Sequence, residues 1–268
     1  MAIVALHTAA TGLSAMSTDI DVTAHNLANV NTTGFKASRA NFEDLLYQEK
    51  AQPGVENSQG DMRPAGLQVG LGVRVSNTAR DFRSGSALET GKPLDLMIEG
   101  NGFFAVDIAE EAGSGIGYTR AGNFFVNADG ELVLGNADGP RLEPNITIPD
   151  DAISVDIAHD GTVSVSTSAS PTPTVAGQVQ LTAFINPNGL RPIGGNLFVE
   201  SDASGPPIEA NPGESGLGTI IQGFLEGSNV DPVRELIHLI KAQRAFEMNS
   251  QSIQAADEAL QVVANLRR

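Results

Sequence analysis

The most regular feature of the chain is a seven-residue spacing of apolar side chains near both ends. Near the amino end the positions are Leu6, Ala9, Leu13, Met16, Ile20, Leu27 and Val30. Near the carboxyl end they are Leu239, Ala242, Phe246, Asn249, Ile253, Ala256, Leu260 and Val263. Such positions are typical of helices that pack along a seam. The pattern predicts two long helices that form a coiled-coil-like layer.

Both predicted helices have recognisable ends. The first is expected to stop at residues 31–34, where Gly34 suits a left-handed cap. The second is expected to begin at Asp231, because Pro232 fits the first turn of a helix and a carboxylate there favours the helix dipole. At 1.5 Å per residue, a helix over residues 232–266 is about 50 Å long. Few small monomers need a helix of that length.

The amino-terminal helix has almost no polar face. Residues 1–30 contain two charged side chains, Asp19 and Asp21, and most positions outside the seam are Ala, Ser or Thr. Such a helix needs burial on nearly all sides, and one partner helix covers only one side. The periodicity alone fits the core helices of a globular protein equally well. The composition favours burial between copies of the chain, with both ends poorly ordered in the free monomer.

The residues expected at the interface between copies are the larger seam residues. They are Leu6, Leu13, Met16, Ile20, Leu27, Val30, Leu239, Phe246, Asn249, Ile253, Leu260 and Val263. Asn249 is the polar member of this set and has two interpretations. Either it fixes the register between helices, or it is a polar residue tolerated near solvent.

The period changes from about 3.5 to 2 in the middle of the chain. Apolar residues alternate with others over 104–108 and 153–157, as in half-buried strands. Asp129-Gly130 and Asp160-Gly161 lie between apolar runs and are typical of hairpin turns. The middle is therefore expected to be antiparallel β, which makes the fold class α+β.

These patterns divide the chain into three parts. Residues 1–36 together with 230–268 are expected to form a discontinuous helical assembly domain, and residues 95–229 a β-rich outer domain. Residues 37–94 are expected to form an extended linker or insertion, because the stretch 47–66 is polar and follows neither period.

Composition and charge exclude several functions. The net charge of −16, from 32 acidic and 16 basic residues, argues against binding to nucleic acid. The block 95–225 alone carries 17 acidic residues against three basic ones. No Cys is present, and no apolar run has the roughly 18 residues of a membrane span. Without a signature of a nucleophile, a metal cluster or a phosphate loop, we expect neither a cofactor nor catalysis.

Several short blocks recur in a recognisable order along the chain. The first contains Asn26, Leu27, Ala28, Asn29, Gly34, Phe35 and Lys36, and the others lie at 99–104, 118–124, 228–230 and 243–247. Together they resemble the flagellar rod and hook proteins, the axial proteins of the bacterial flagellum. Within that family the stretch 42–68 is most similar to the members that form the distal rod. Its distinguishing positions are Tyr47, Gln52, Pro53, Gly54, Pro64 and Gly66.

The resemblance implies a structural protein, exported unfolded through the flagellar type III apparatus without a cleaved signal peptide. Copies are then expected to form a helical tube that crosses the periplasm to the outer membrane and transmits torque to the hook. The implied partners are further copies, the proximal rod proteins, the hook protein, the L- and P-ring proteins and the rod cap. Neither nucleic acid nor membrane insertion is implied.

Three other interpretations stay open at this stage. A hook or proximal rod protein of the same family is disfavoured by the stretch 47–66 and by the chain length. A periplasmic carbohydrate-active enzyme with helical tails would need a pair of acidic side chains in a cleft. A secreted adhesin would bind a ligand through its β domain as a monomer.

Overall fold

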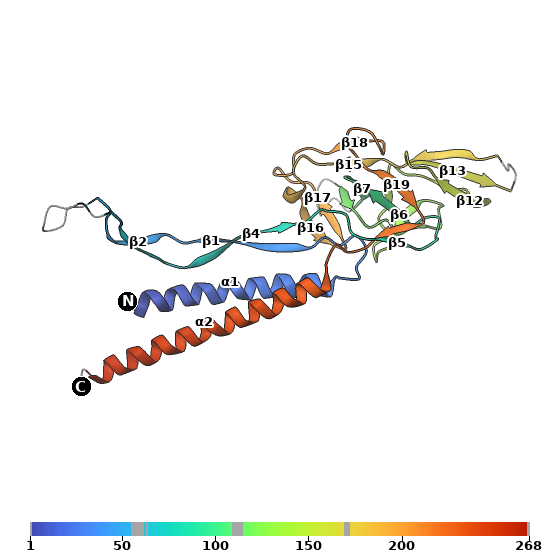
Figure 1. Ribbon diagram of the computed structural model, residues 1–268. Helices are drawn as coiled ribbons and strands as arrows, with labels where there is room; N and C mark the ends of the chain where they lie inside the picture. The colour runs from blue at the N-terminus through green and yellow to red at the C-terminus, as the bar shows by residue number, and fades with distance from the viewer. Residues whose placement is uncertain (1, 55–61, 63, 109–114, 169–171, 267–268) are drawn as a thin grey trace. The chain divides into compact units, whose positions relative to one another are not determined.

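The computed structural model contains two long helices and many short strands (Figure 1). It describes residues 2–54, 62, 64–108, 115–168 and 172–266. These divide into two compact units. Unit 1 comprises residues 1–28, 38–79 and 231–268, and unit 2 comprises residues 29–37 and 80–230. The terminal helices and the antiparallel middle confirm the predicted α+β class.

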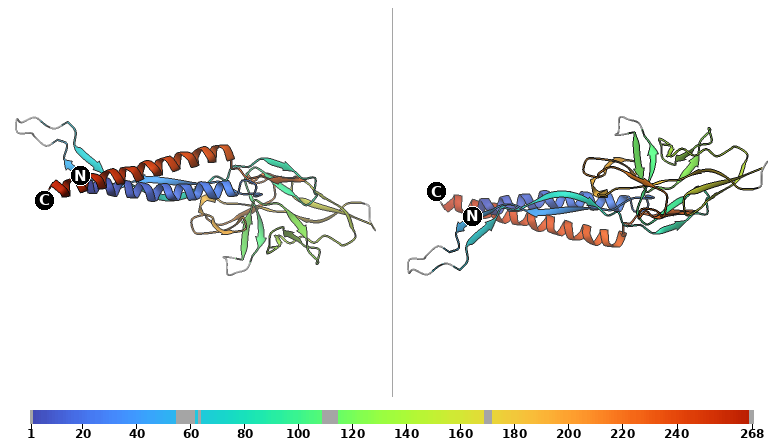
Figure 2. Two further views of the ribbon diagram at one scale, coloured as in Figure 1. Left: turned by 90° about the horizontal axis from the view of Figure 1, so that it is seen from below. Right: turned by 90° about the horizontal axis from the view of Figure 1, so that it is seen from above.

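Unit 1 consists of two helices and two pairs of strands. Its elements are α1 (Ala2–Ala28), β1 (Ser38–Asp44), β2 (Tyr47–Ala51), β3 (Leu67–Gly70), β4 (Val73–Arg80) and α2 (Pro232–Leu266). β1 pairs with β4, and β2 pairs antiparallel with β3. The paired strands form a ribbon that follows α1 on the side away from α2 (Figures 1 and 2).

The ribbon is held to α1 by polar contacts at several levels. His7 Nδ1 lies 3.1 Å from the carbonyl oxygen of Leu71, and the Thr11 hydroxyl accepts a hydrogen bond from the backbone N–H of Val73 at 3.4 Å. α2 and the ribbon therefore both cover α1, whereas from the sequence we expected cover by α2 alone within one chain.

Among the residues that the structure describes, the segment expected to be a linker, 37–94, contains five strands. β2 is mostly exposed and polar, so no alternation of apolar residues marks it. In β3, Leu67 and Val69 alternate with Gln68 and Gly70, but only over four residues. Both segments are strands because the backbone of β2 pairs with the backbone of β3. Gly66 lies close to this pairing, where an added Cβ would be 2.8 Å from the carbonyl oxygen of Ala51.

The start of α2 agrees with the prediction, whereas the end of α1 does not. Asp231 Oδ1 accepts hydrogen bonds from the N–H groups of Val233 and Arg234 at 3.0 and 3.2 Å, so it caps a helix that begins at Pro232. The first helix ends at Ala28, before the predicted residues 31–34.

Gly34 has the predicted left-handed conformation, with φ of 70°. Its role differs from the expected helix cap, because α1 has already ended six residues earlier. An added Cβ would lie 2.6 Å from the backbone nitrogen of Ala121. Gly34 is therefore required by a close approach of two backbone segments.

Among the residues that the structure describes, unit 2 consists of short strands and one turn of 3₁₀ helix. The strands are β5 (Ala87–Glu89), β6 (Leu96–Glu99), β7 (Phe103–Asp107), β8 (Ile116–Thr119), β9 (Phe124–Val126), β10 (Leu132–Leu134), β11 (Leu142–Glu143), β12 (Ala152–Ile157), β13 (Thr162–Thr167), β14 (Thr174–Gln178), β15 (Leu181–Ala183), β16 (Arg191–Gly194), β17 (Leu197–Val199), β18 (Ile208–Ala210), β19 (Thr219–Gln222) and β20 (Phe224–Glu226); the 3₁₀ turn is η2 (Pro187–Gly189). The largest sheet has seven strands in the order β16-β17-β8-β7-β15-β18, with β11 also on β7. A second sheet, β12-β13-β14, extends to one side of the unit (Figure 2).

Both predicted hairpins are confirmed. β9 pairs antiparallel with β10, and β12 with β13. The two turns end in Gly130 and Gly161, which have φ of 81° and 83°. The N–H of Asn127 donates to the carbonyl oxygen of Glu131, and the N–H of Ala158 donates to that of Thr162, so each turn contains three residues rather than the Asp-Gly pair alone.

The core of unit 2 lies on both faces of β7. Phe104 and Val106 face a large apolar cluster that includes Leu132 and Leu181, and Phe103 belongs to a second, aromatic-rich cluster. The prediction of a half-buried strand at 104–108 is therefore wrong for residues 104–106, which are all buried, as is Phe103 just before them. Phe103 and Ala105 are buried by Phe184, Phe198 and Tyr118, which reach them from distant parts of the sequence.

Candidate functional site

The face of α1 that is most buried within unit 1 carries small and polar residues. These are Ala9, Gly12, Ala15, Asp19, Thr23 and Asn26. The larger seam residues flank this face and remain partly exposed: Leu6, Leu13, Met16, Ile20 and Leu27. Val30 follows α1, belongs to unit 2 and is also partly exposed. The single chain thus places the predicted seam on its helix pair but leaves the larger seam residues of α1 partly exposed.

The predicted seam of α2 is incompletely covered as well. Ala242 is buried, and Leu239, Asn249 and Ile253 are partly buried. Phe246 and Leu260 are 38% and 37% exposed. Val263 lies within α2, but its side chain is outside the described part of the structure.

Polar and small residues make the closest contacts between the helices. An added Cβ on Gly12 would lie 3.0 Å from Nδ2 of Asn249, which supports the interpretation that Asn249 fixes the register. Asn26 Nδ2 donates to Glu235 Oε2 at 3.3 Å. These contacts depend on position along the helix more than apolar contacts do.

Asp19 is a buried carboxyl between the helices. Its burial raises its pKa, while His238, whose Nδ1 lies 3.8 Å from Asp19 Oδ2, acts in the opposite direction. Thr23 lies one turn further along α1, and its hydroxyl is 3.2 Å from the same nitrogen of His238. The interface within one chain is therefore polar where the second half of α1 meets the start of α2.

The signature residue Asn26 connects α1 to the ribbon. Its side chain is buried, accepts a hydrogen bond from the N–H of Ser38 at 2.9 Å and donates to the carbonyl oxygen of Ser38 at 2.7 Å. Leu27 and Asn29 of the signature are partly exposed and Ala28 is exposed, whereas Gly34, Phe35 and Lys36 are buried in unit 2.

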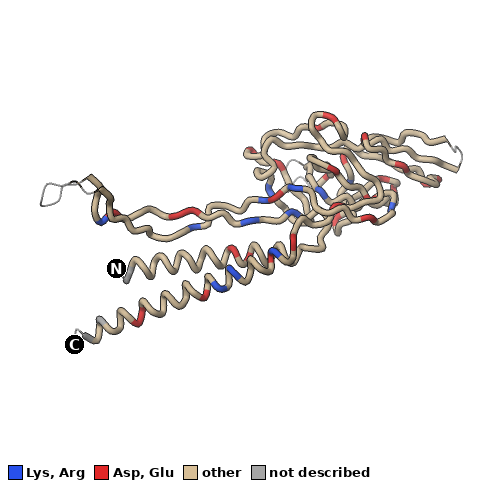
Figure 3. The backbone as a smooth tube through the Cα atoms, in the orientation of Figure 1, with Lys and Arg blue, Asp and Glu red and all other residues tan. Residues whose placement is uncertain are grey.

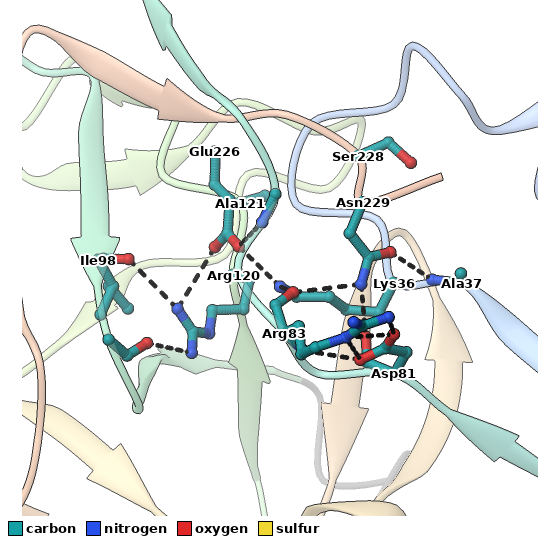
Figure 4. A network of polar contacts seen from close by, with 12 residues as sticks. Lys36, Ala37, Asp81, Arg83, Ile98, Arg120, Ala121, Glu226, Ser228 and Asn229 are labelled. Atoms are coloured by element: carbon teal, nitrogen blue, oxygen red, sulfur yellow. Dashed lines mark hydrogen bonds and ion pairs between the residues drawn. The ribbon is translucent and has the colours of Figure 1, made fainter. Parts of the chain in front are cut away.

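Lys36 belongs to a buried group of charges (Figure 4). Its Nζ donates to Glu226 Oε1 at 2.6 Å and to the carbonyl oxygen of Arg83 at 2.7 Å. Arg120 Nη1 reaches the other oxygen of Glu226 at 3.4 Å, and its Nη2 donates to the carbonyl oxygen of Gly100 at 2.6 Å. Burial lowers the pKa of both Lys36 and Arg120. One carboxylate thus neutralises part of the charge of two buried cations.

Asn229 ties further backbone segments to this group (Figure 4). Its Oδ1 accepts from the N–H of Ala37 at 2.8 Å, and its Nδ2 donates to the carbonyl oxygens of Asp81 and Arg83 at 2.7 and 3.1 Å. The chain passes between the two units four times, after residues 28, 37, 79 and 230. Unit 2 therefore holds together the segments that lie next to three of these passages.

We call this group the joint. It contains the buried charges Lys36, Arg120 and Glu226, together with the partly exposed Asp81 and Asn229 and the exposed Arg83. Three of the recognised sequence blocks contain Lys36, Arg120 and Asn229, but no sequence pattern pointed to Glu226. Opposite charges at buried positions far apart in sequence are visible only after folding.

The stretch 42–68 places its distinguishing residues on the surface of unit 1. Tyr47, Gln52, Pro53, Gly54, Pro64 and Gly66 are all exposed. Tyr47 hydrogen-bonds to Asp44, whose charge also helps to raise the pKa of the phenol. The ribbon therefore offers polar and aromatic groups to its surroundings.

Neither metal binding nor membrane insertion is indicated in the described ranges. No three His, Cys, Asp or Glu side chains within these ranges are grouped as metal ligands. Neither α1 nor α2, over the residues described, combines the length and apolarity that a membrane span needs.

Three family descriptions match separate parts of the chain. "Flagella basal body rod protein" matches residues 6–36, "Flagellar hook protein FlgE/F/G D1 domain" matches 97–165, and "Flagellar basal body rod FlgEFG protein C-terminal" matches 221–266. The matched ranges include most of both helices and much of the β unit.

Similar proteins cover the chain almost from end to end. The flagellar basal-body rod protein FlgG of Caulobacter vibrioides is 44% identical over 98% of this chain and 99% of its own length. FlgG of Bacillus subtilis is 42% identical over 98% of both chains. FlgF of Caulobacter vibrioides is 35% identical over 88% of this chain and 87% of its own.

Proposed function

This chain belongs to the family of flagellar basal-body rod proteins, and we propose that it is the subunit of the distal rod. It is a structural protein of the flagellar basal body. Identities of 44% and 42% to FlgG proteins, against 35% to a FlgF protein, favour the distal over the proximal rod. In this role the protein transmits torque from the motor to the hook and catalyses no reaction.

The partly exposed seam is the observation that carries this proposal. The large apolar residues of α1 and α2 flank an interface made of small and polar residues. One chain therefore leaves the large residues accessible. Further copies bury this surface at roughly 25 cal/mol per Å² of apolar area. A tube of such helix pairs has a continuous inner layer.

Export through the type III apparatus and contacts to other rod and hook proteins, the rings and the rod cap follow from this assignment. We place the protein in the rod that crosses the periplasm to the outer membrane. These contacts are made by surfaces of the assembled rod, since the cores of both units are already used within each copy.

The acidic surface suits a shaft that rotates inside a ring. Acidic residues are spread over unit 2 (Figure 3), and the block 95–225 has 17 against three basic residues. Hydration and like-charge repulsion keep such a surface from adhering. Replacing a set of these acids by neutral amides should increase friction in the ring. If the inner wall of the ring is strongly basic and binds the rod less tightly after this replacement, the acidic surface does not act to prevent adhesion.

The ribbon supplies rigidity in this proposal. Its exposed residues, such as Tyr47, Gln52 and Pro64, contact neighbouring subunits and stiffen the tube. Deletion of residues 47–66 should then give a bendable, hook-like polymer, visible by electron microscopy. An unchanged rigid rod contradicts the bridging role while leaving the assignment as a rod subunit intact.

Substitution Ile253→Asp tests assembly through the helices. A buried charge is costly, so we expect assembly to be lost in sedimentation while the β signal in circular dichroism persists. Ile185→Asp is the matched control, because Ile185 is 79% exposed in unit 2 and lies outside the helices; it should assemble. Collapse of the whole fold by Ile253→Asp would place α2 in the core of the monomer.

A further inference from the structure

A second apolar surface of α2 lies outside the predicted seam. Its residues are Val233, Leu236, Ile237 and Ile240, with exposed fractions of 64%, 50%, 49% and 43%. Their spacing of three and four residues places them along one side of the helix. We call them the outer ridge. Contiguous exposed apolar groups of this kind mark an interaction surface.

Positive charge borders the outer ridge. Lys241 and Arg244 follow it on α2 and are exposed. Within the described residues, neither forms an ion pair with a carboxylate of the same chain, whereas Arg234 at the start of α2 pairs with Asp231 at 3.2 Å. A partner surface that suits the ridge therefore offers a carboxylate one turn beyond an apolar contact.

The outer face of α1 has this combination. Its exposed residues recur every three or four positions: His7, Ala10, Ser14, Ser17, Asp21, Ala24 and Ala28. Asp21 is the exposed carboxylate of α1, and Figure 3 shows the N-terminal half of the helix without charged side chains. The small side chains around it permit large residues of another helix to approach the backbone closely.

A groove elsewhere in unit 1 fits the ridge less well. It has a volume of about 640 Å³ and is lined by Val4, Thr8, Val69, Asn249 and Lys50. None of the described residues that line this groove carries a carboxylate that could face Lys241 and Arg244. Charge therefore selects α1 over the groove.

We propose that the outer ridge of α2 packs on the outer face of α1 of a second copy, with Lys241 and Arg244 near Asp21. The inference rests on the proposed function, since it names the contact through which rod subunits join. The contact unites two different surfaces, so each copy uses both and the assembly continues without closing into a dimer. It is separate from the seam residues, which flank the interface between α1 and α2 of the same chain.

Paired cysteines test this contact, because the natural chain has no Cys. Ile240→Cys is combined in one chain with Ser14→Cys, Ser17→Cys or Ala24→Cys, and the assembled protein is oxidised and run on a non-reducing gel. We expect at least one pair to give a ladder of dimers, trimers and longer species. Each single variant should give no ladder.

Three results overturn the proposal. One is an assembled polymer without a ladder from any pair. The second is a ladder from Ile240→Cys with Val69→Cys, which places the ridge in the groove. The third is a covalent dimer from Ile240→Cys alone, which indicates that two ridges face each other. Failure of the unmodified chain to polymerise would instead contradict the proposed function.

Charge exchange gives a second readout. Asp21→Lys should raise the concentration needed for assembly by about tenfold or more, the effect of about 1.4 kcal/mol. Adding Lys241→Glu and Arg244→Glu to the same chain should restore assembly. If the triple variant assembles no better than Asp21→Lys alone, Asp21 does not face these cations and the proposed pairing is wrong.

Discussion

The two units of this protein use apolar residues in opposite ways. In unit 2, side chains such as Leu132, Phe104 and Val163 are completely buried by the same chain. In unit 1, the buried face of α1 is small and polar, and the large residues of both helices remain partly or fully exposed. Unit 2 therefore buries its large apolar side chains within one molecule, whereas unit 1 leaves many of its own accessible, and in the proposed rod other copies cover them.

The joint lies at the boundary in the sequence between these two kinds of structure. Lys36, Arg120 and Glu226 are 2%, 2% and 0% exposed, and they hold segments of unit 2 that continue directly into unit 1. A load applied to the helices must pass through these segments to reach the β unit. Buried charge-assisted hydrogen bonds suit that position because they are short and directional.

Hydrogen exchange on the dilute, unassembled chain gives the largest expected difference. Amides of β7 and β13 should be protected at least about a thousandfold more than those of α1 and α2, because a stable domain opens at a cost of about 5 kcal/mol or more. Mass spectrometry of peptides measures both in one sample. Strong protection of α1 and α2 at a concentration below assembly contradicts the comparison between the units.

Glu226→Ala should cause the largest loss of stability in unit 2. It leaves Lys36 and Arg120 buried without their carboxylate, and removing one partner of a buried ion pair costs about 3–5 kcal/mol. Guanidinium unfolding followed by circular dichroism measures the loss. Asp107→Ala is the control, because its ion pair with Arg141 is exposed and should change the midpoint little. Equal midpoints for both variants would show that the joint is not a stabilising element.

Gly34→Ala should destabilise unit 2 more than Gly91→Ala. Both glycines have left-handed φ, 70° and 68°, which costs a side chain about 1–2 kcal/mol. At Gly34 the new Cβ also meets backbone atoms at 2.6 Å, whereas nothing lies within 4 Å at Gly91. We expect about 2–5 kcal/mol for Gly34→Ala in the same unfolding measurement. Equal costs would mean that the backbone near Ala121 moves freely.

Asp19→Asn should have the smallest effect, and it should depend on pH. Because burial raises the pKa of Asp19 above its ordinary value of 3.8, the paired helices bind the proton more tightly than the unfolded chain. The stabilisation by the neutral carboxyl is complete below that ordinary value and is lost as the pH rises through the raised pKa. Asp19→Asn should remove this loss and raise the melting temperature of the assembled helices slightly near pH 7. A lower melting temperature there would show that the attraction between Asp19 and His238 outweighs the burial.

Regular patterns in the sequence predicted the elements that depend on near neighbours. The start of α2 at Pro232, the length of that helix and both hairpins follow from local propensity, capping and turn chemistry. The ribbon was not predicted, because exposed strands such as β2 need no apolar alternation to form. The end of α1 was placed too late for a related reason: Gly34 is required by Ala121, a residue far away in the sequence.

By itself, the sequence determined the class of the fold, the two helices with their apolar residues, and the absence of charge on most of α1. Only the tertiary structure decided which face of α1 is buried within one chain, that Glu226 neutralises Lys36 and Arg120, and that Phe103 is covered as fully as Phe104. The reason is physical. Helical and strand periods come from the backbone within a few residues, whereas burial and ion pairing depend on groups that folding brings together from distant positions.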